Sequence, residues 1–233
     1  MDLPLNLQDY TTLENYLFNI CQMISVNYSI IDIRKVEYLL SNDNYQAFFN
    51  ILSGDDWKEF YQFRMLKRKS EWLSGRLAAK IALFSHKAKE NITVDFRDIK
   101  ILKNKNKAPY FSNCNDLYLS ITHSHPYAIA VVSKNKIGID IEKLISSTSI
   151  FSLFFSDIEI KELYKHDNTL SLKLATMAWT QKEAISKYRG LGMKLNFREI
   201  KTSLTPALFR QQKIEMYTSQ ISNFYVSIAT RSN

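Results

Sequence analysis

The amino-acid sequence predicts an α+β fold in two halves, each of which packs a helix on an antiparallel sheet. A helical pattern at residues 56–89 is followed by short apolar strands that run to residue 142. A second helical region at residues 157–188 is followed by a hairpin pattern near the C-terminus. Helix then strands, twice in the same order, favours two packed layers in each half. We therefore expect domains at residues 1–134 and 135–233.

The first half opens with a mixed stretch that contains an apolar segment, Tyr16–Ile24, and a strand-like segment, Ser29–Ile33. The helical pattern that follows carries an apolar stripe at helical spacing, typical of a helix with one packed face. We place a break in this helix near Lys67–Lys69. The stripe consists of Leu73, Leu77, Ile81 and Phe84.

Apolar runs separated by turn residues indicate that strands dominate the middle of the chain. Asn104–Pro109 is expected to form a basic turn, and His123–Pro126 a tight connection. The predicted strands are Thr93–Leu102, Leu117–Thr122, Tyr127–Ser133 and Lys136–Glu142.

The second half repeats the order of elements. Helices are predicted at residues 157–166 and 170–188, and the second ends at a glycine-containing segment, Arg189–Gly192. The tail is interpreted as a hairpin, with strands Lys213–Ser219 and Phe224–Thr230 joined by Gln220–Asn223.

Composition narrows the partners without choosing among them. The 31 Lys and Arg against 23 Asp and Glu give a net charge of +8. Such a surplus favours nucleic acid, an anionic membrane, phosphorylated cofactors or an acidic protein. Cys21 and Cys114 are far apart and lack ligand-like neighbours, which indicates buried thiols in a reducing compartment. No signal-peptide pattern and no run of membrane-spanning length is present, so we expect a cytoplasmic protein.

Two short segments carry the charged residues that point to chemistry. Asp140 and Glu142 stand two apart in an apolar strand, so both carboxylates leave the same side of the sheet. Glu183 and Lys187 stand four apart on a predicted helix and therefore share one face. Three carboxylates and an ammonium are suited to holding Mg²⁺ against a phosphate and moving a proton beside it.

The predicted helix has two contrasting faces. One is expected to pack, and Trp179 accompanies Glu183 and Lys187 on the opposite one. Alone, a Glu–Lys pair at this spacing is usually a solvated pair. The upstream Asp140 and Glu142 reverse that interpretation, because like charges on a buried strand repel unless a cation or a wet cleft receives them. The packing face consists of Leu174, Ala178, Gln181 and Ile185.

The two segments and the 43 positions between Asp140 and Glu183 resemble the 4′-phosphopantetheinyl transferase superfamily, in its Sfp-like and enterobactin-synthetase branch. That family carries a Gly-hydrophobic-Asp-hydrophobic-Glu strand and then Trp-x-x-Lys-Glu-Ala-x-x-x-Lys. The resemblance implies a monomeric pseudo-dimer of two similar α+β halves, with the active site in the cleft between them.

The resemblance also implies roles for these residues. Asp140, Glu142 and Glu183 would bind Mg²⁺ together with the coenzyme A pyrophosphate. Glu183 would take the proton from a carrier-protein serine, and Lys187 would neutralise the leaving group. Lys182 would be a secondary contact to phosphate or to the carrier.

A third segment, from Arg68 to Lys80, resembles the Arg-x-x-Glu-Phe-Leu-x-Gly-Arg helix of the enterobactin-type branch. The match implies that Arg68 and Arg76 bind the nucleotide phosphates, a task that suits guanidinium geometry. Without the match, the row of Arg68, Trp72, Arg76 and Lys80 reads as a solvated helix face.

Two further segments resemble coenzyme A contacts of the family. Thr122 and His123 match a Ser-His pair that holds the 3′-phosphate, although His125 stands where the family often has glycine. Lys107 and Pro109 match a turn near the adenine; alone, they read as part of a solvated basic loop.

The implied activity is transfer of 4′-phosphopantetheine from coenzyme A to a serine of an acidic acyl or peptidyl carrier protein, with release of 3′,5′-ADP and no nucleic acid partner. The pathway served, siderophore or other secondary metabolism among them, stays open. Two alternatives remain. A metal-dependent nuclease could use Asp140, Glu142 and Lys143, and a non-enzymatic basic binding protein could pair its own charges.

Overall fold

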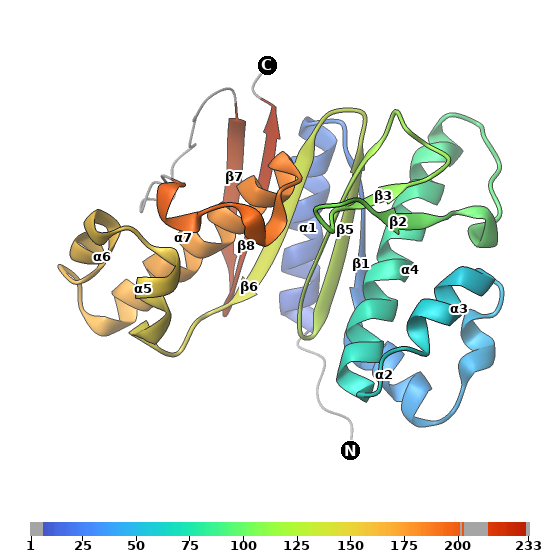
Figure 1. The fold of residues 1–233 in the computed structure, drawn as a ribbon, viewed down its shortest axis with the longest axis horizontal. Helices are drawn as coiled ribbons and strands as arrows, with labels where there is room; N and C mark the ends of the chain where they lie inside the picture. Colours follow the sequence, from blue (N-terminus) through green and yellow to red (C-terminus); the bar gives the residue numbers. More distant parts are fainter. Residues whose placement is uncertain (1–6, 201, 203–213, 232–233) are drawn as a thin grey trace. The chain divides into compact units, whose positions relative to one another are not determined.

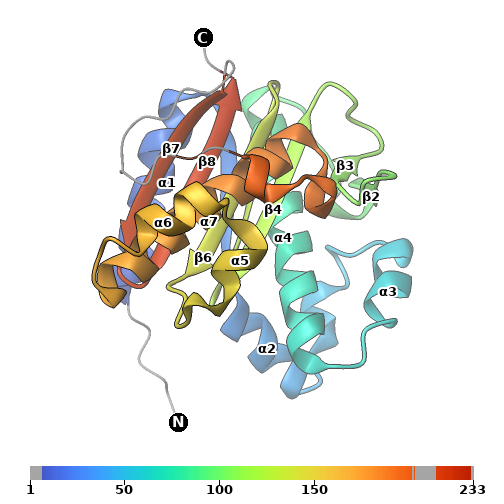
Figure 2. The same cartoon turned by 60° about the vertical axis from the view of Figure 1, so that its left-hand side comes forward.

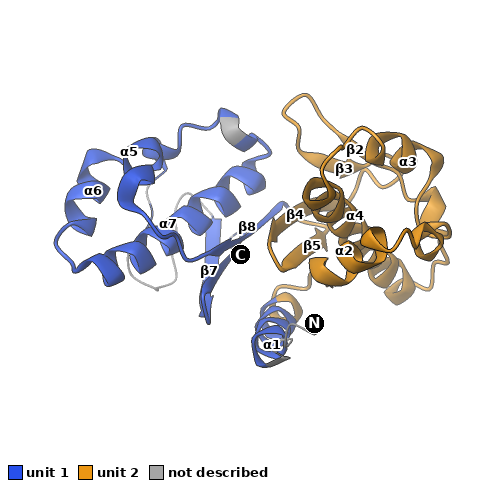
Figure 3. Ribbon diagram, turned by 90° about the horizontal axis from the view of Figure 1, so that it is seen from below, with its two compact units in different colours: residues 1–20, 136–233 blue, residues 21–135 orange. Residues whose placement is uncertain are grey.

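A computed structural model describes residues 7–200, 202 and 214–231 of the chain. These form two compact units, and each is described by itself (Figure 3). Unit 1 consists of residues 1–20 and 136–233, and unit 2 of residues 21–135. The first twenty residues thus group with the C-terminal part of the chain. The expected division into domains at residues 1–134 and 135–233 stays a prediction.

Unit 2 packs a long helix, α4 (Leu66–Lys89), on a three-stranded antiparallel sheet (Figure 1). The strands are β1 (Asn27–Asp32), β5 (Tyr127–Ser133) and β4 (Tyr118–Ser124), in that spatial order. The alanine-rich face of α4 contributes Ala78, Ala79 and Ala82 to the core, and small side chains allow helix and sheet to approach closely. The remaining elements are α2 (Ile33–Ser41), α3 (Gly54–Phe60) and the β2–β3 ribbon (Ile101–Lys103 and Pro109–Phe111).

Unit 1 repeats this arrangement. Its long helix, α7 (Asn168–Arg189), lies across β6 (Ile137–Lys143) and β8 (Phe224–Arg231) (Figures 1 and 2). The third strand is β7 (Ile214–Ile221), and the spatial order is β6-β8-β7. Short helices α5 (Phe151–Phe154) and α6 (Asp157–Leu163) precede α7, and α1 (Leu7–Met23) begins in this unit.

The two sheets have the same topology: the first strand pairs with the last, and the last with the middle one. Between the first and middle strands, each unit places a short capped helix, a long helix and a 3-10 turn, at Phe96–Asp98 in unit 2 and Phe197–Glu199 in unit 1. The predicted α+β fold of two similar halves is therefore confirmed.

In unit 2, a buried lysine connects these repeated elements. Ser53 and Asp56 form a capping box that begins α3. The ammonium of Lys80, on α4, lies 2.8 Å from the Asp56 carboxylate and donates to the carbonyl oxygens of Ile51 at 2.9 Å and Phe96 at 2.8 Å. One fully buried ammonium thus fixes the short helix and the 3-10 turn to the long helix.

Unit 1 contains the same connection. Ser156 and Glu159 form a capping box at the start of α6. Lys182, on α7, donates to the Glu159 carboxylate at 2.8 Å and to the carbonyl oxygens of Phe154 at 3.2 Å and Phe197 at 2.8 Å. The repeat therefore extends from the topology to individual hydrogen bonds.

Several predicted boundaries differ from the structure. Thr93–Leu102 is not one strand: the Asp95 side chain accepts from the backbone N–H of Arg97, which starts a 3-10 turn, and β2 begins only at Ile101. The break in the first helical region falls at residues 61–65, before Lys67–Lys69, in a stretch without glycine or proline to mark it.

The remaining elements lie close to their expected positions. The apolar segment Tyr16–Ile24 overlaps the second half of α1, which begins earlier, at Leu7. The hairpin is present, but its turn is only Ser222–Asn223, and the predicted first residue, Lys213, lies outside the described residues. No helix in the described ranges is both long and apolar enough to span a bilayer.

Candidate active site

The close contact between β6 and α7 brings together the two charged segments predicted from the sequence. A side chain on Gly138 would overlap the carbonyl oxygen of Ala184 and the amide nitrogen of Tyr188, so only glycine allows the strand to lie this near the helix. Ile139 and Ile141 are fully buried on the opposite side of the strand. Asp140 and Glu142 alternate with them and share the side of Gly138. The carboxylates consequently face α7.

Asp140 and Lys187 form an ion pair within this contact. The Lys187 ammonium lies 2.6 Å from Oδ1 of Asp140, and the two side chains are 25% and 3% exposed. A carboxylate this deeply buried requires a cationic partner. The ammonium of Lys187 compensates the charge of Asp140.

The other two carboxylates hold protons more tightly than usual. Burial raises the pKa of Glu142 to about 8, with the negative charge of Asp140 adding to the effect. Burial also raises the pKa of Glu183 to about 7; Lys187 opposes this, and the Asp140 charge reinforces it. The carboxylates are therefore near enough to repel one another.

This arrangement fits a bound Mg²⁺ in its chemistry. All three candidate ligands offer carboxylate oxygens, which Mg²⁺ prefers, and their mutual repulsion is what a cation relieves. No cluster of three His, Cys, Asp or Glu side chains in the described ranges is already gathered at ligand geometry. The Lys187 ammonium lies on Oδ1 of Asp140, so a metal ion at that oxygen would share it with the ammonium or displace it.

Trp179 connects the helix to Glu142. Its indole N–H donates to Oε1 of Glu142 at 3.4 Å, and its ring packs against those of Phe154 and Phe197. The sequence predicts Trp179 beside the charged pair, as observed. It also predicts one packed and one open face for this helix, but more of the helix is buried than expected. Thr180, Lys182, Ala184 and Ser186 are also buried, so α7 is enclosed over most of its circumference near the site.

Lys182 differs from its expected role. It is fully buried, and its three N–H donors go to Glu159, Phe154 and Phe197. An ammonium has three donors, so none remains for a phosphate or a carrier protein. The structure makes Lys182 an internal connection rather than the secondary contact predicted.

Arg76 is neither an exposed phosphate ligand nor part of a solvated helix face, the two roles expected from sequence. The guanidinium is buried; it forms an ion pair with Glu59 and donates to the carbonyl oxygen of Ile101 at 2.7 Å. Glu59 also binds the Lys103 ammonium at 2.6 Å. The row of cations on α4 is thus mostly an internal network rather than a solvated face or a set of exposed phosphate ligands. Arg68 is the exception: its side chain is 55% exposed, and it lies 3.7 Å from Glu71.

The remaining predicted coenzyme A contacts all lie in unit 2. Lys107 is exposed and has a positive φ of 64°, in a loop whose backbone N–H groups at Asn106 and Ala108 donate to the Asn104 side chain. That side chain orders the basic loop, a role that the sequence analysis missed. Pro109 is half-buried at the start of β3.

On β4, Thr122 is buried and His123 is exposed, as alternation along a strand requires. His125, which had no explanation from sequence, lies 3.7 Å from the Glu37 carboxylate of α2. A cleft between the halves stays a prediction.

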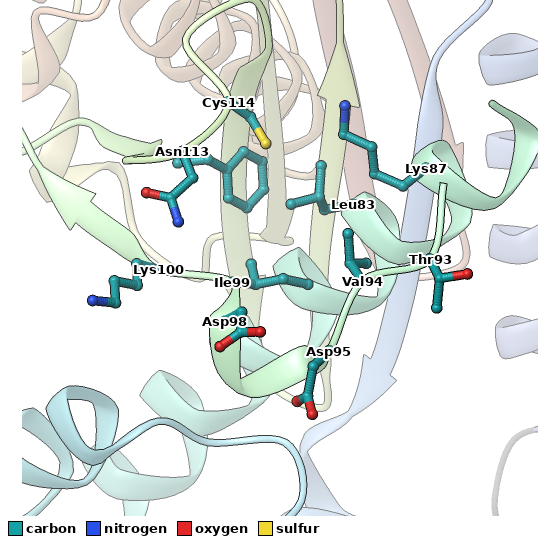
Figure 4. A pocket seen from close by; sticks show the side chains of 11 residues that line it. Leu83, Lys87, Thr93, Val94, Asp95, Asp98, Ile99, Lys100, Asn113 and Cys114 are labelled. Atoms are coloured by element: carbon teal, nitrogen blue, oxygen red, sulfur yellow. The ribbon is translucent and has the colours of Figure 1, made fainter. Parts of the chain in front are cut away.

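A cavity of about 330 Å³ lies within unit 2, at the end of α4 (Figure 4). Leu83, Ile99 and Phe111 form its apolar part, and Lys87 and Lys100 line it too. None of the predicted site residues lines it.

The sequence analysis also overlooked Glu159 and Phe197, the partners of Lys182. A signal for Glu159 was present, because Ser-x-x-Glu before a helix is the pattern of a capping box. Nothing local in the sequence shows that the carboxylate binds a lysine 23 positions later.

Two family models match this chain, one in its N-terminal part and one in its C-terminal part. Residues 136–228 match the 4′-phosphopantetheinyl transferase superfamily, and residues 61–133 match the 4′-phosphopantetheinyl transferase N-terminal domain. The holo-[acyl-carrier-protein] synthase of a Geobacillus species is 35% identical over 115 residues, which span 47% of this chain and 94% of that protein.

Two longer relatives match over about half of each chain. The transferase Sfp of Bacillus subtilis is 30% identical over 44% of this chain and 46% of its own length. Enterobactin synthase component D of Salmonella typhimurium is 35% identical over 52% of this chain and 48% of its own length. A solved holo-(acyl-carrier-protein) synthase from Bacillus anthracis, in complex with coenzyme A, aligns with 46% of this chain and 91% of its own at 26% identity and a TM-score of 0.39. The two family matches and the near-complete coverage of the Geobacillus synthase show that this chain belongs to the 4′-phosphopantetheinyl transferase superfamily.

Proposed function

We propose that the four charged side chains on β6 and α7 carry the reaction of this superfamily, in which 4′-phosphopantetheine passes from coenzyme A to a carrier protein. The observation that supports this most directly is the convergence of Asp140, Glu142, Glu183 and Lys187 within unit 1. The acceptor is a serine hydroxyl of an acyl or peptidyl carrier protein, and the leaving group is 3′,5′-ADP. Such a transfer depends on positioning and charge neutralisation more than on covalent chemistry by the enzyme.

Asp140, Glu142 and Glu183 would hold Mg²⁺. When bound, the ion supplies neutralisation of the pyrophosphate charge. The raised pKa values of Glu142 and Glu183 support this assignment, because a cation favours the ionised carboxylates that burial disfavours.

Glu183 is also the proposed base. Burial raises the pKa of Glu183 to about 7, and a bound cation would lower it again, so the carboxylate would be ionised and able to accept a proton at neutral pH. The proton of the serine hydroxyl would pass to a carboxylate oxygen of Glu183 as the serine attacks phosphorus.

Lys187 neutralises charge on the phosphate and the leaving group. Its side chain is a quarter exposed, whereas Asp140 is buried, so the ammonium can swing away from the carboxylate toward substrate. A flexible lysine suits such an exchange of partners better than a rigid guanidinium.

For coenzyme A, we propose contacts from Arg68, Lys107, Pro109, Thr122 and His123 in unit 2. Lys107, His123 and Arg68 are exposed and polar, which supports phosphate contacts for these three. Arg76 would contribute through the Glu59–Lys103 network that joins α3, α4 and β2.

The net charge of +8 supports an acidic carrier as the protein partner, because opposite charge accelerates encounter. The likeness to enterobactin synthase component D favours a siderophore or related secondary pathway. We further propose a monomer that acts in the cytoplasm, where free thiols such as Cys21 and Cys114 persist.

The test is incubation with coenzyme A, Mg²⁺ and a panel of apo carrier proteins, read by intact mass. We expect one carrier class to gain a single phosphopantetheine, with no gain when EDTA replaces Mg²⁺. Asp140→Asn, Glu142→Gln and Glu183→Gln should each abolish transfer, whereas Glu162→Gln, on the exposed side of α6, should not. Normal transfer by any of the three site variants at saturating Mg²⁺ would refute the shared carboxylate site. The family membership displaces the nuclease and binding-protein alternatives, and cleavage of DNA by the same preparation would reopen the first.

A further inference from the structure

Trp179 makes two different kinds of contact with the surroundings of the proposed metal site. Its ring centroid lies 3.9 Å from that of Phe154 and 5.1 Å from that of Phe197, and these two rings also contact each other at 6.1 Å, so the indole belongs to a cluster of three aromatic rings. Its indole N–H points to Glu142 and donates to Oε1 at 3.4 Å. An indole has no other polar atom, so the side chain's hydrogen-bonding capacity is directed at this carboxylate.

The backbone is anchored at both phenylalanines that contact Trp179. Lys182 donates to the carbonyl oxygens of Phe154 and Phe197, and its third donor binds Glu159. These are strong anchors, because a buried ammonium that loses an acceptor bears a desolvation cost. The backbones that carry the rings are therefore joined to α7 one turn from Trp179 itself.

A neutral donor suits Glu142 better than a second cation would. Asp140 already has a cationic partner, the Lys187 ammonium at 2.6 Å from Oδ1. The indole N–H orients Oε1 of Glu142 without adding positive charge near a cation site, and a carboxylate has a second oxygen for a metal ion.

We propose that Trp179 is a positioning residue for the divalent cation: its N–H fixes the orientation of the Glu142 carboxylate, and packing against Phe154 and Phe197 fixes the indole. The inference rests on the proposed function, since it assigns Glu142 to the metal. A distance of 3.4 Å is long for a hydrogen bond, and such bonds in ligand-free sites commonly shorten once the ligand binds.

The test is metal affinity rather than activity alone. Trp179→Phe removes the N–H and keeps an aromatic ring, and Trp57→Phe is a matched control in the aromatic cluster of unit 2, where Trp57 lies 5.8 Å from Phe49 between ring centroids. Mn²⁺ and Mg²⁺ binding would be measured by calorimetry with coenzyme A present, because the proposed site holds the ion together with the coenzyme A pyrophosphate. We expect Trp179→Phe to weaken metal binding by about tenfold, the lower end of what loss of a ligand-orienting partner causes, and Trp57→Phe to leave it unchanged.

Two more measurements separate positioning from folding. The KM for Mg²⁺ in Trp179→Phe should rise about tenfold, while kcat at saturating Mg²⁺ stays within a few-fold of wild type. If Trp179→Phe unfolds, a benzothienyl analogue at position 179 keeps the shape of indole and replaces only the N–H, and should show the same loss of affinity.

Equal metal affinity in wild type and in the variant or analogue that lacks the N–H would overturn the inference and leave the proposed function standing. Failure of wild type to bind either ion would overturn the proposed metal site together with the inference. A large fall in kcat with an unchanged KM for Mg²⁺ would also overturn it, because that result assigns Trp179 to the chemical step.

Discussion

Replacing Lys187 with alanine removes two functions of one side chain, and the structure predicts a separate result for each. In the metal-free protein, the ammonium compensates Asp140 at 2.6 Å, with Asp140 3% exposed. Loss of one partner of a fully buried pair costs about 3–5 kcal/mol. Because Lys187 is a quarter exposed, water can replace part of its contribution, and we expect about 2 kcal/mol.

For a protein of this size, that loss corresponds to a fall in Tm of about 4–8 °C. The melting curve should be measured in EDTA and again with Mg²⁺. Mg²⁺ should raise the Tm of Lys187→Ala more than that of wild type, because no ammonium competes for Asp140. Lys173→Ala, on the same helix, is the control and should change neither value.

The second function appears in transfer. Single-turnover transfer at saturating coenzyme A and Mg²⁺ should fall by about 100-fold, as expected when a group that stabilises developing charge is removed. Lys187→Arg should restore the rate only in part, since a planar fork does not replace a compact ammonium. A rate within about threefold of wild type means less than about 0.7 kcal/mol of transition-state stabilisation, and Lys187 would then have only the structural role.

Four further predictions concern the site and its surroundings. Gly138→Ala should separate β6 from α7 and abolish transfer. Gly54→Ala, where nothing lies within 4 Å of the added methyl group, is the control and should keep full activity. An active Gly138→Ala would show that the close contact is not required. Lys80→Met and Lys182→Met should each lower the free energy of unfolding by about 3–5 kcal/mol in chemical denaturation, because each leaves a buried carboxylate without its ammonium. Only Lys182→Met should also weaken Mg²⁺ binding. An equal loss of Mg²⁺ affinity in both would contradict the local role of Lys182. Glu142 and Glu183 hold protons up to about pH 8 and 7 in the folded metal-free protein, above the ordinary value of 4.5, so folding takes up protons and metal-free stability should decline as pH rises from about 5 to 8. Mg²⁺ binding at pH 7 should release about one proton, measured by calorimetry in two buffers of different ionisation enthalpy, and release should disappear near pH 9; release that does not change with pH would contradict the raised pKa values.

The catalytic half of the site could be predicted from sequence because its geometry is local. Asp140 and Glu142 share a side because strand residues alternate, and Glu183 and Lys187 share a face because a helix turns every 3.6 residues. Glycine is rare in this chain, and Gly138 lies where the strand and the helix touch. A glycine at this position is therefore a sequence signal for the close contact.

The cations on the two long helices could not be predicted in the same way. Arg76 and Lys182 have basic side chains on predicted helices, and most such residues are solvated. Their burial depends on Glu59 and Glu159, carboxylates of short capped helices that reach the long helix only through tertiary packing. The Asp95 turn was missed for a related reason: its side chain competes with strand formation in a segment whose apolar residues alone favour a strand.

The most direct test of the central claim is to locate the metal ion. Crystals of the protein grown with Mn²⁺ and coenzyme A would be measured at the manganese absorption edge. We predict one anomalous peak bound by Asp140, Glu142 and Glu183, with the Lys187 ammonium moved from Asp140 to a phosphate oxygen. A peak bound by other residues, or an undisturbed Lys187–Asp140 pair beside bound coenzyme A, would contradict the account.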